Sequence, residues 1–264
     1  MGLDGYMMRW NLTPDGAAIR TTSSDLMPVR WQGRAAMLKV TRSVVEVRGY
    51  DLMVWLDGQG AAQVFRKGGR GLLMERLHPE PALAEMALGN QDSAATQILC
   101  SAAVQVHQQR PDHPSSLLTL WEWFEELAES AELGGVFRQA WVTAQRLLAD
   151  QRDVRPLHGD LHHGNVLRSP ERGWLVIDPK GLTGERTFDF ANMLCNPTLA
   201  HALTSGRLER QSALIAQEAG LDRTRLLAWV GAYAALSAAW HLEDAQMEQA
   251  RQSLAVSALA HSLH

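Results

Sequence analysis

The sequence predicts an α+β protein with two lobes, a small β-rich lobe that contains one helix and a larger lobe that is mainly helical. Three observations indicate this fold class. Short apolar segments separated by turn signals fill the first third of the chain, long amphipathic segments follow Leu77, and short segments with turns return over residues 154–190. We therefore expect two domains, residues 1–76 and residues 77–264.

The first lobe begins with four segments of strand character, "RWNL", "AIRTTSS", "MPVRW" and "AAMLKV". The stretches "TPDG" and "WQGR" between them are typical of hairpin turns. This part of the chain is therefore expected to consist mainly of β-hairpins.

A single helix is predicted to interrupt these strands. In "VVEVRGYDLMVWLDG", Val47, Tyr50, Val54 and Trp55 can share one face, and Gly58 is placed to end the helix. Strand character then returns in two apolar runs around "RKGGRG". This glycine-rich stretch resembles a phosphate-binding loop, but it lacks the spacing GxGxxG and follows the strand "AAMLKV". We therefore interpret it as a hairpin turn.

The second lobe contains several segments with helical periodicity. The first follows Asp92, which is expected to cap it, and has Ile98, Leu99, Ala102 and Val106 at helical spacing. The others are "SLLTLWEWFEELAES", "GVFRQAWVTAQRLLAD" and "DRTRLLAWVGAYAALSAAW", the last with Asp222 as its N-cap.

The composition excludes some classes of protein. Hydrophobic residues make up 46% of the chain and charged residues 20%, an ordinary globular balance, and the formal charge of −4 gives no electrostatic support for nucleic-acid binding. No apolar run reaches the roughly 18 residues of a membrane span, and "MGLDGYMMRW" lacks the apolar core of a signal peptide. The two cysteines are far apart and form no CxxC pair. We expect a cytoplasmic protein without a membrane or nucleic-acid partner; the sequence does not predict an oligomeric state.

The stretch "HGDLHHGN", residues 158–165, contains three histidines, an aspartate and an asparagine. One interpretation is a zinc site, because His158 and His162 are four residues apart, as two ligands on a helix would be. However, Gly159 and Gly164 interrupt the segment, which disfavours a helix, and no neighbouring Cys or His completes a tetrahedral set.

Phosphoryl transfer accounts for more of these residues. Protein kinases use an aspartate followed, after four residues, by an asparagine, and then a second aspartate after the next hairpin. Asp160 and Asn165 have this spacing, and Asp178 ends the apolar strand "WLVID". We interpret Asp160 as the catalytic base, and Asn165 and Asp178 as oxygen ligands of Mg²⁺. His158 is expected to bond the backbone around the second aspartate.

A kinase also needs side chains for the nucleotide. Lys39 ends the strand "AAMLKV", where a kinase has the lysine that contacts the α- and β-phosphates of ATP, and Glu46 opens the next helix and could pair with it. The alternative is a solvated lysine and an acid favoured by the helix dipole. Ser23 and Ser24, which precede the lysine strand, are candidates to cover the phosphates.

The end of "LLMERL" is the expected adenine site. We predict that the side chain of Met74 flanks the base and that the backbone of Glu75 and Leu77 bonds it. This prediction rests on position alone, because backbone recognition leaves almost no sequence signature.

With these residues in place, the chain resembles the aminoglycoside and hydroxyurea antibiotic resistance kinases, especially the streptomycin 6-phosphotransferases. The likeness covers most of the chain and is carried by "MLKV", "GYDLMVWLDGQGAA", "LLMER", "PLHGDLHHGNVL", "RGWLVIDPKGLTGERTFDFANML" and "LSAAW". It implies a bilobal protein-kinase-like fold. It also implies transfer of the γ-phosphate of ATP to a hydroxyl of streptomycin or a related aminoglycoside, which inactivates the antibiotic.

The resemblance implies the same roles for Asp160, Asn165, Asp178, Lys39 and Glu46. Asp189 matches an acid that supports the catalytic loop from below. Two positions depart from the relatives: Gly164 stands where they have Glu, and Lys180 adds a positive charge beside the magnesium site. That charge would either bond phosphate or repel a cationic aminoglycoside.

A streptomycin-like substrate carries guanidinium groups, so its pocket should offer carboxylates and an aromatic wall. We expect Glu185, Trp240 and Glu243 in this pocket; the alternative is that the acids are solvated and the tryptophan belongs to the core. Two other functions remain open. One is a kinase of another small hydroxyl compound, such as hydroxyurea or a metabolite, and the other is a nucleotide-binding pseudokinase.

Overall fold

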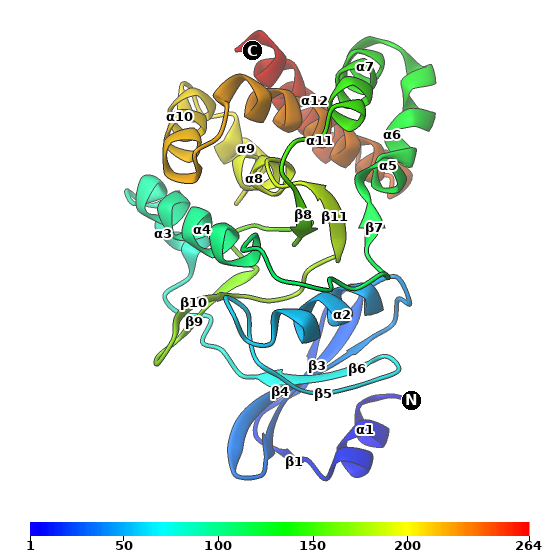
Figure 1. The fold of residues 1–264 in the computed structure, drawn as a ribbon, viewed down its shortest axis with the longest axis vertical. Coiled ribbons are helices and arrows are strands. Elements are labelled where there is room, and N and C mark those ends of the chain that lie inside the picture. The colour runs from blue at the N-terminus through cyan, green and yellow to red at the C-terminus, as the bar shows by residue number, and fades with distance from the viewer. Residues whose placement is uncertain (264) are drawn as a thin grey trace.

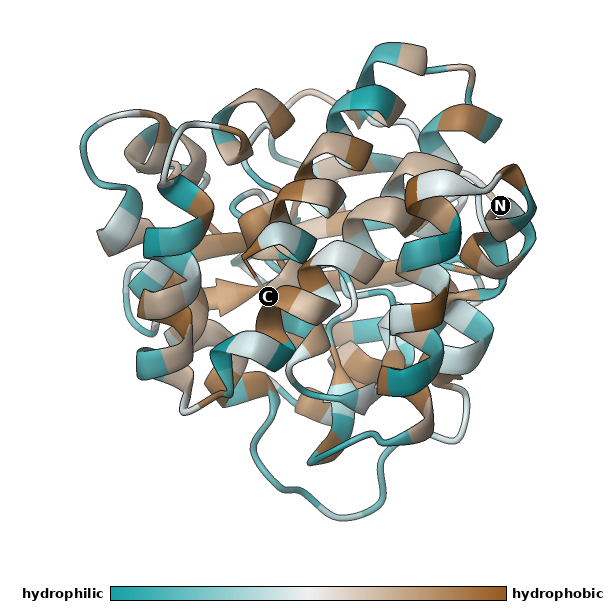
Figure 2. Cartoon of the chain, turned by 90° about the horizontal axis from the view of Figure 1, so that it is seen from above, coloured by the Kyte–Doolittle hydropathy of each residue, from teal (hydrophilic) through white to brown (hydrophobic). Residues whose placement is uncertain are grey.

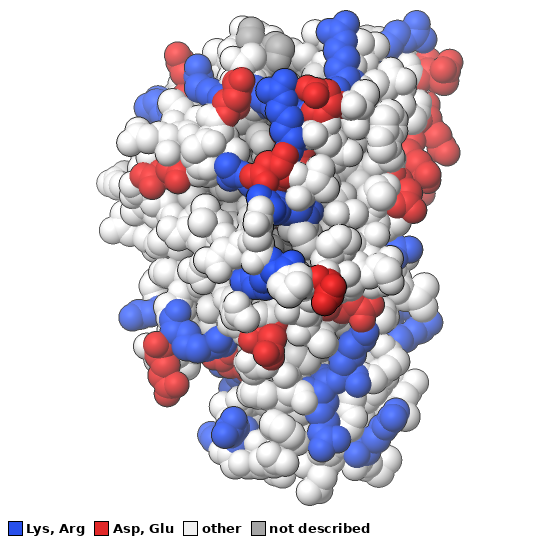
Figure 3. All heavy atoms as spheres, in the orientation of Figure 1, with Lys and Arg blue, Asp and Glu red and all other residues white. Residues whose placement is uncertain are grey.

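The computed structural model describes residues 1–263 and confirms the α+β class with two lobes. An antiparallel sheet forms the N-terminal lobe, and helices form most of the C-terminal lobe (Figure 1). Apolar segments lie mainly in the interior helices and strands, and the outer loops are hydrophilic (Figure 2). Basic and acidic side chains are both spread over the face shown in Figure 3. The lobe boundary between residues 76 and 77 remains our prediction.

The N-terminal sheet has the order β1-β3-β4-β6-β5, with β2 paired to β3. Its strands are β1 (Thr13–Pro14), β2 (Ile19–Arg20), β3 (Ser24–Trp31), β4 (Arg34–Thr41), β5 (Val64–Gly68) and β6 (Gly71–Glu75). "WQGR" is the β3–β4 turn, as predicted, and both of its central residues, Gln32 and Gly33, have the positive φ that a tight hairpin needs. "RKGGRG" is likewise the β5–β6 turn.

The predicted strand "RWNL" is wrong. Its first two residues end helix α1 (Leu3–Trp10). Tyr6 and Trp10 are one helical turn apart and pack beneath the sheet with Val29 and Leu38. The apolar spacing that supports this helix is too short to be distinguished from a strand by pattern alone.

Helix α2 (Val47–Leu56) lies between the sheet and the C-terminal lobe (Figure 1). It buries Tyr50, Leu52, Met53 and Leu56. Val54 was expected on the buried face, but it is 45% exposed. The expectation failed because the buried face of the helix is formed by residues 49, 50, 52, 53 and 56, and Val54 lies outside it.

The C-terminal lobe is organised around one long helix, α11 (Arg223–Glu243), which is buried on most sides. Phe124 and Phe188 pack against Trp229 of this helix. The remaining helices are α3 (Leu83–Leu88), α4 (Asp92–Val106), α5 (Leu120–Trp123), α6 (Glu125–Ser130), α7 (Gly135–Ala149), α8 (Phe188–Leu194), α9 (Leu199–Ala202), α10 (Arg207–Ala219) and α12 (Met247–Ser262), with a short 3₁₀ turn, Ala131–Leu133.

The two predicted helix caps have different outcomes. Asp222 caps α11 as expected, because its carboxylate accepts the Arg225 N–H at 3.2 Å. Asp92 does not cap α4, since Gln91 occupies the N-cap position. The Asp92 carboxylate instead accepts hydrogen bonds from Arg207 at 2.8 and 2.9 Å, which ties α4 to α10.

Five short strands interrupt the helices and carry the polar cluster. They are β7 (Leu118–Thr119), β8 (Val154–Leu157), β9 (Val166–Ser169), β10 (Gly173–Val176) and β11 (Leu182–Glu185). β9 and β10 form a hairpin, and β11 pairs with β7 and β8. "HGDLHHGN" therefore connects β8 to β9, and Asp178 lies on the loop from β10 to β11.

The β9–β10 hairpin also contacts the chain just before β5 and just after β6 of the N-terminal sheet. The His78 N–H donates to the Arg168 carbonyl at 2.9 Å, and the Ala62 N–H donates to the Val176 carbonyl at 3.0 Å. Within residues 1–263, no helix is both long and apolar enough to span a membrane.

Helix α2 approaches the Asp178 loop closely at Gly49, where a Cβ atom would collide with the carbonyl oxygen of Pro179. We predict that Gly49→Ala destabilises the protein by about 1–3 kcal/mol, because one of the two segments must move. Thermal unfolding measures this loss. Gly2→Ala is the control, since nothing lies within 4 Å of its Cβ position; equal midpoints for both variants would contradict the prediction.

Candidate active site

The backbone of the polar loop is organised around the His158 ring. Its Nε2 donates to the Ile177 carbonyl at 2.9 Å, and its Nδ1 accepts the Asp160 N–H at 3.2 Å. A carbonyl can only accept and an N–H can only donate, so this histidine is neutral. Complete burial lowers its pKa, although Asp189 and Asp160 oppose the effect. With both nitrogens occupied, His158 is not available as a zinc ligand.

Asp189 supports the same loop from beneath, as expected. Its carboxylate is buried and accepts the N–H groups of His158 and Gly159 at 2.8 and 2.7 Å. Burial alone would raise the pKa of Asp189, but the hydrogen bond with His107, at 2.8 Å, and the neighbouring groups lower it. The sequence did not single out His107, which lies just beyond the end of α4 and carries no local signal of its role.

Asp160 itself faces the interlobe side and is about one-quarter exposed. Asn192 donates to its Oδ1 at 3.0 Å, and the ammonium of Lys180 lies 3.4 Å from its Oδ2. Asn192 was missed as a site residue although it lies in "FDFANM". Its contact with Asp160 depends on how α8 packs against the loop, which the sequence does not show.

Asn165 and Asp178 are adjacent, because the Ile177 N–H donates to the Asn165 carbonyl at 2.9 Å. The Asn165 amide nitrogen donates to the Asp160 carbonyl at 2.8 Å, so its amide oxygen remains available as a ligand. Asp178 has φ of 59°, which is uncommon for a residue with a side chain. Its carboxylate is about one-third exposed.

These two oxygen donors fit Mg²⁺, which prefers carboxylate and carbonyl oxygen and usually keeps water or phosphate in its remaining positions. Within residues 1–263, no three His, Cys, Asp or Glu side chains are grouped as a complete metal site. The protein therefore offers a partial set that nucleotide phosphates could complete.

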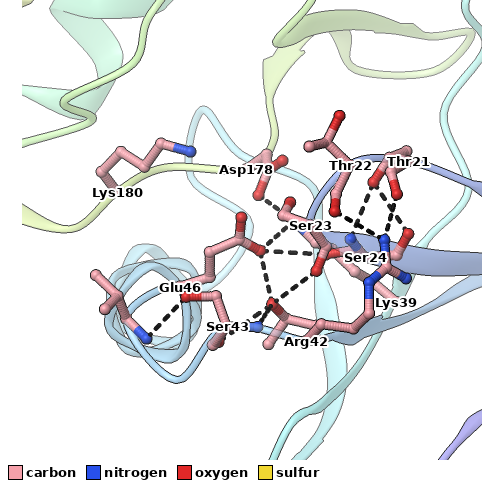
Figure 4. Close-up of polar contacts among 12 residues, drawn as sticks. Thr21, Thr22, Ser23, Ser24, Lys39, Arg42, Ser43, Glu46, Asp178 and Lys180 are labelled. Atoms are coloured by element: carbon pink, nitrogen blue, oxygen red, sulfur yellow. Dashed lines mark hydrogen bonds and ion pairs between the residues drawn. The ribbon is translucent and has the colours of Figure 1, made fainter. Parts of the chain in front are cut away.

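Lys39 and Glu46 form the expected pair, with Nζ and Oε2 3.5 Å apart, and the Lys39 ammonium also contacts the Asp178 carboxylate (Figure 4). Lys39 is only 4% exposed, so it is not a solvated strand-end lysine. Burial would raise the pKa of Glu46, but hydrogen bonds from neighbouring hydroxyls and the charge of Lys39 lower it to about 2. Glu46 is therefore ionised at neutral pH.

The two serines differ in their surroundings. Ser24 is buried, and its hydroxyl donates to the Glu46 carboxylate at 3.1 Å (Figure 4). The Thr41 hydroxyl donates to the same carboxylate at 2.8 Å. Its N–H donates to the Thr21 hydroxyl at 3.0 Å. Ser24 thus supports the acid and has neither group free for phosphate. Ser23 is more exposed, and its part in covering phosphate remains a prediction.

The expected adenine site has part of its backbone already occupied. Met74 is buried in β6, and the Glu75 N–H donates to the Gln63 carbonyl at 2.8 Å. Glu75 can therefore offer only its carbonyl to a base. The Leu77 N–H makes no backbone hydrogen bond within the described chain, which suits the predicted donor role.

Glu185 was expected in the substrate pocket, and this expectation is wrong. It is 1% exposed and accepts hydrogen bonds from the guanidinium of Arg225, at 2.7 Å from Nε, and from the Arg152 N–H at 3.1 Å. A carboxylate at the end of a short strand is equally consistent with a pocket and with a buried ion pair. Only the packing of α11 against β11 distinguishes the two.

Trp240 lies in a row of aromatic rings near the catalytic loop. Its ring is edge-to-face with Trp123, with centroids 5.3 Å apart, and its centroid lies 6.4 Å from that of Tyr233. Burial raises the pKa of the Tyr233 hydroxyl, and the charge of Asp160 contributes to the same shift.

Two acidic residues lie on α11 and on α6, which packs against it. Glu243 is exposed at the end of α11. Burial raises the pKa of Glu126, and the charge of Glu243 raises it further. Glu126 was missed from the sequence because nothing relates α6 to the end of α11 in the primary structure.

The fold and these contacts define a protein of the kinase-like phosphotransferase class. Residues 9–245 match the model of the aminoglycoside/hydroxyurea antibiotic resistance kinases, and the chain belongs to this family. It is 45% identical to the streptomycin 3''-kinase of Klebsiella pneumoniae, over 97% of this chain and 99% of the relative. It is 30% identical to the streptomycin 6-kinase of Streptomyces glaucescens, over 96% and 87%.

Solved structures support the same fold. An aminoglycoside phosphotransferase in ternary complex with AMP-PNP and hygromycin B superposes with a TM-score of 0.67 at 13% identity, covering 97% of this chain and 96% of that one. A choline/ethanolamine kinase family protein from Mesorhizobium loti superposes with a TM-score of 0.71 at 11% identity, covering 100% and 95%.

The buried position of Glu185 predicts a loss of stability on mutation. Glu185→Ala leaves the Arg225 guanidinium without its partner, so we expect the free energy of unfolding to fall by about 3–5 kcal/mol. Thermal unfolding measures this effect, with Glu171→Ala, at an exposed acid, as the control. A variant that keeps its stability and loses only affinity for substrate would restore Glu185 to the pocket.

Proposed function

We propose that this protein is an ATP-dependent phosphotransferase that phosphorylates a hydroxyl of streptomycin or a closely related cationic aminoglycoside, and so inactivates it. One observation carries the proposal. The structure brings Lys39 and Glu46 of the N-terminal lobe against Asp178, beside the loop of Asp160 and Asn165. These are the groups that a kinase needs for nucleotide and acceptor.

In the proposed reaction, Lys39 contacts the α- and β-phosphates of ATP and Glu46 fixes its position. Asn165 and Asp178 would hold Mg²⁺, which when bound neutralises charge on the phosphates. Asp160 orients the acceptor hydroxyl and takes its proton. A bond forms between the acceptor oxygen and the γ-phosphorus, the bond to the β-phosphate oxygen breaks, and its electron pair leaves with ADP.

The substrate class follows from the surroundings of Asp160. Trp123, Tyr233 and Trp240 form an aromatic row, and Glu243 follows Trp240 by three residues on α11. Aromatic faces attract guanidinium groups, and carboxylates bind them through paired hydrogen bonds. These groups therefore support a cationic acceptor.

The acceptor is named from the relatives together with this pocket. Relatives named for two different positions of streptomycin match the chain, a 3''-kinase at 45% identity and 6-kinases at 30% and 26%. Phosphorus and proton NMR of the product would assign the hydroxyl. A hydroxyurea phosphotransferase matches at 28%, so hydroxyurea belongs in the acceptor panel.

The role of Asp160 predicts a large kinetic effect. Asp160→Asn should lower kcat by about 10²–10⁴-fold with the affinity for Mg-ATP largely kept, because a general base acts only on the chemical step. Coupled ADP release with and without streptomycin measures this change, and Asp4→Asn on the exposed side of α1 is the control.

Near-full turnover of Asp160→Asn would contradict the assigned base. Turnover with hydroxyurea and not with streptomycin would change the substrate class. Failure of the native protein to turn over ATP with any hydroxyl compound would favour the pseudokinase.

The aromatic row predicts a separate effect on substrate binding. Trp240→Ala and Glu243→Gln should each raise the KM for streptomycin by about tenfold, since one cation–π or charge-assisted contact is worth about 1–2 kcal/mol. The KM for ATP should stay within twofold. Trp121→Ala is a matched control, because Trp121 is 45% exposed on the same helix as Trp123. Equal effects at Trp121 and Trp240 would refute the pocket.

A further inference from the structure

Lys180 occupies a position that neither the kinase spacing nor the nucleotide pair explains. It follows Asp178 by two residues, and its N–H donates to the His158 carbonyl at 2.7 Å, which joins the Asp178 loop to the catalytic loop. Its side chain reaches back so that Nζ lies 3.4 Å from the Asp160 carboxylate. In Figure 4 the same amino group points toward Asp178.

We propose that Lys180 is a catalytic residue whose ammonium binds the phosphoryl group while it passes from nucleotide to acceptor. This inference rests on the proposed function. In the proposed reaction Asp160 lies next to the acceptor hydroxyl, and Asp178 lies next to the phosphates of the nucleotide. A cation that contacts the first carboxylate and points toward the second lies on the path between them.

The two lysines of the site divide the phosphate groups between them. Lys39 extends from the sheet, is almost fully buried, and is already paired with Glu46 and Asp178. Lys180 is more accessible, with 28% of its side chain exposed, and comes from the side of the acceptor. Lys39 therefore suits the phosphates that stay with ADP, and Lys180 suits the group that is transferred.

The contact with Asp160 also indicates when Lys180 acts in the proposed reaction. Before nucleotide binds, the Lys180 ammonium neutralises the catalytic carboxylate. When the γ-phosphate arrives, the ammonium exchanges this partner for phosphoryl oxygens, and Oδ2 of Asp160 becomes free to accept the proton of the acceptor. Lys180 keeps its own protons throughout, and charge developing on the transferred group is stabilised by a donor already in place.

The local backbone keeps this lysine in one position. Gly181 has φ of 71°, and a Cβ there would lie 2.8 Å from the Arg48 carbonyl oxygen, so the chain turns sharply after Lys180 against helix α2. A Cβ at Gly159 would lie 3.2 Å from the Lys180 Cβ. The lysine therefore sits where the two loops and α2 meet. If Lys180 instead repelled a cationic substrate, removal of its charge would lower the KM for streptomycin.

Titration calorimetry without acceptor tests the assignment, using Mg-AMP-PNP and Mg-ADP as probes. Lys180→Met should weaken binding of AMP-PNP by about tenfold and binding of ADP by less than twofold, because only the first has a γ-phosphoryl group. It should also lower kcat with streptomycin by about 10²–10³-fold and leave the KM for streptomycin unchanged.

Lys180→Arg should recover part of the lost AMP-PNP affinity and part of the lost kcat. Lys67→Met removes a lysine paired with Asp51, away from the site, and is the control.

Equal losses for the two nucleotides, or no loss for either, would overturn the role of Lys180. So would a lower KM for streptomycin with unchanged kcat, which is the signature of relieved repulsion. If Lys180→Met does not fold, Lys180→Gln is measured in the same way. A Lys180→Gln variant that keeps both the affinity for AMP-PNP and kcat would refute the proposal. If the native protein binds neither nucleotide, the proposed function itself fails.

Discussion

The active-site geometry depends on one buried carboxylate. Asp189 accepts the N–H groups of His158 and Gly159, and its charge is compensated by these bonds and by His107. Inside a protein such a group is costly unless every lone pair is satisfied. Because it is satisfied, the loop that carries Asp160 is held in one conformation. The rest of the site takes its position from this loop.

Two contacts transmit that position to the other lobe. The Lys39 ammonium touches Asp178, and Gly49 of α2 approaches the Pro179 carbonyl so closely that no side chain fits between them. The helix that follows Glu46 is therefore packed directly on the loop that carries Asp178, the proposed metal ligand. A kinase must align groups from two lobes on one phosphate chain, and this packing aligns them before any nucleotide binds.

Local patterns predicted much of this arrangement. The spacing of Asp160 and Asn165, and the apolar strand before Asp178, depend on backbone geometry over short distances, so they can be read from the sequence. Predictions failed where packing between distant segments decides. Asp92 was predicted to cap α4, but its carboxylate accepts a hydrogen bond from Arg207 of α10 instead. Glu185 was predicted to line the substrate pocket, but its carboxylate accepts a hydrogen bond from Arg225 of α11.

The sequence by itself determined the class of fold, and it supplied the order along the chain of the groups that we propose to be catalytic. Each of these depends on residue type and on separations of a few residues. Only the tertiary structure decided that His107 and Asn192 support the site, that Ser24 serves Glu46, and that Lys180 faces Asp160. Most of these contacts join segments that are far apart in the chain, and the others depend on the direction of a turn that the local sequence does not encode. Which residues meet is therefore decided by how the helices and loops pack.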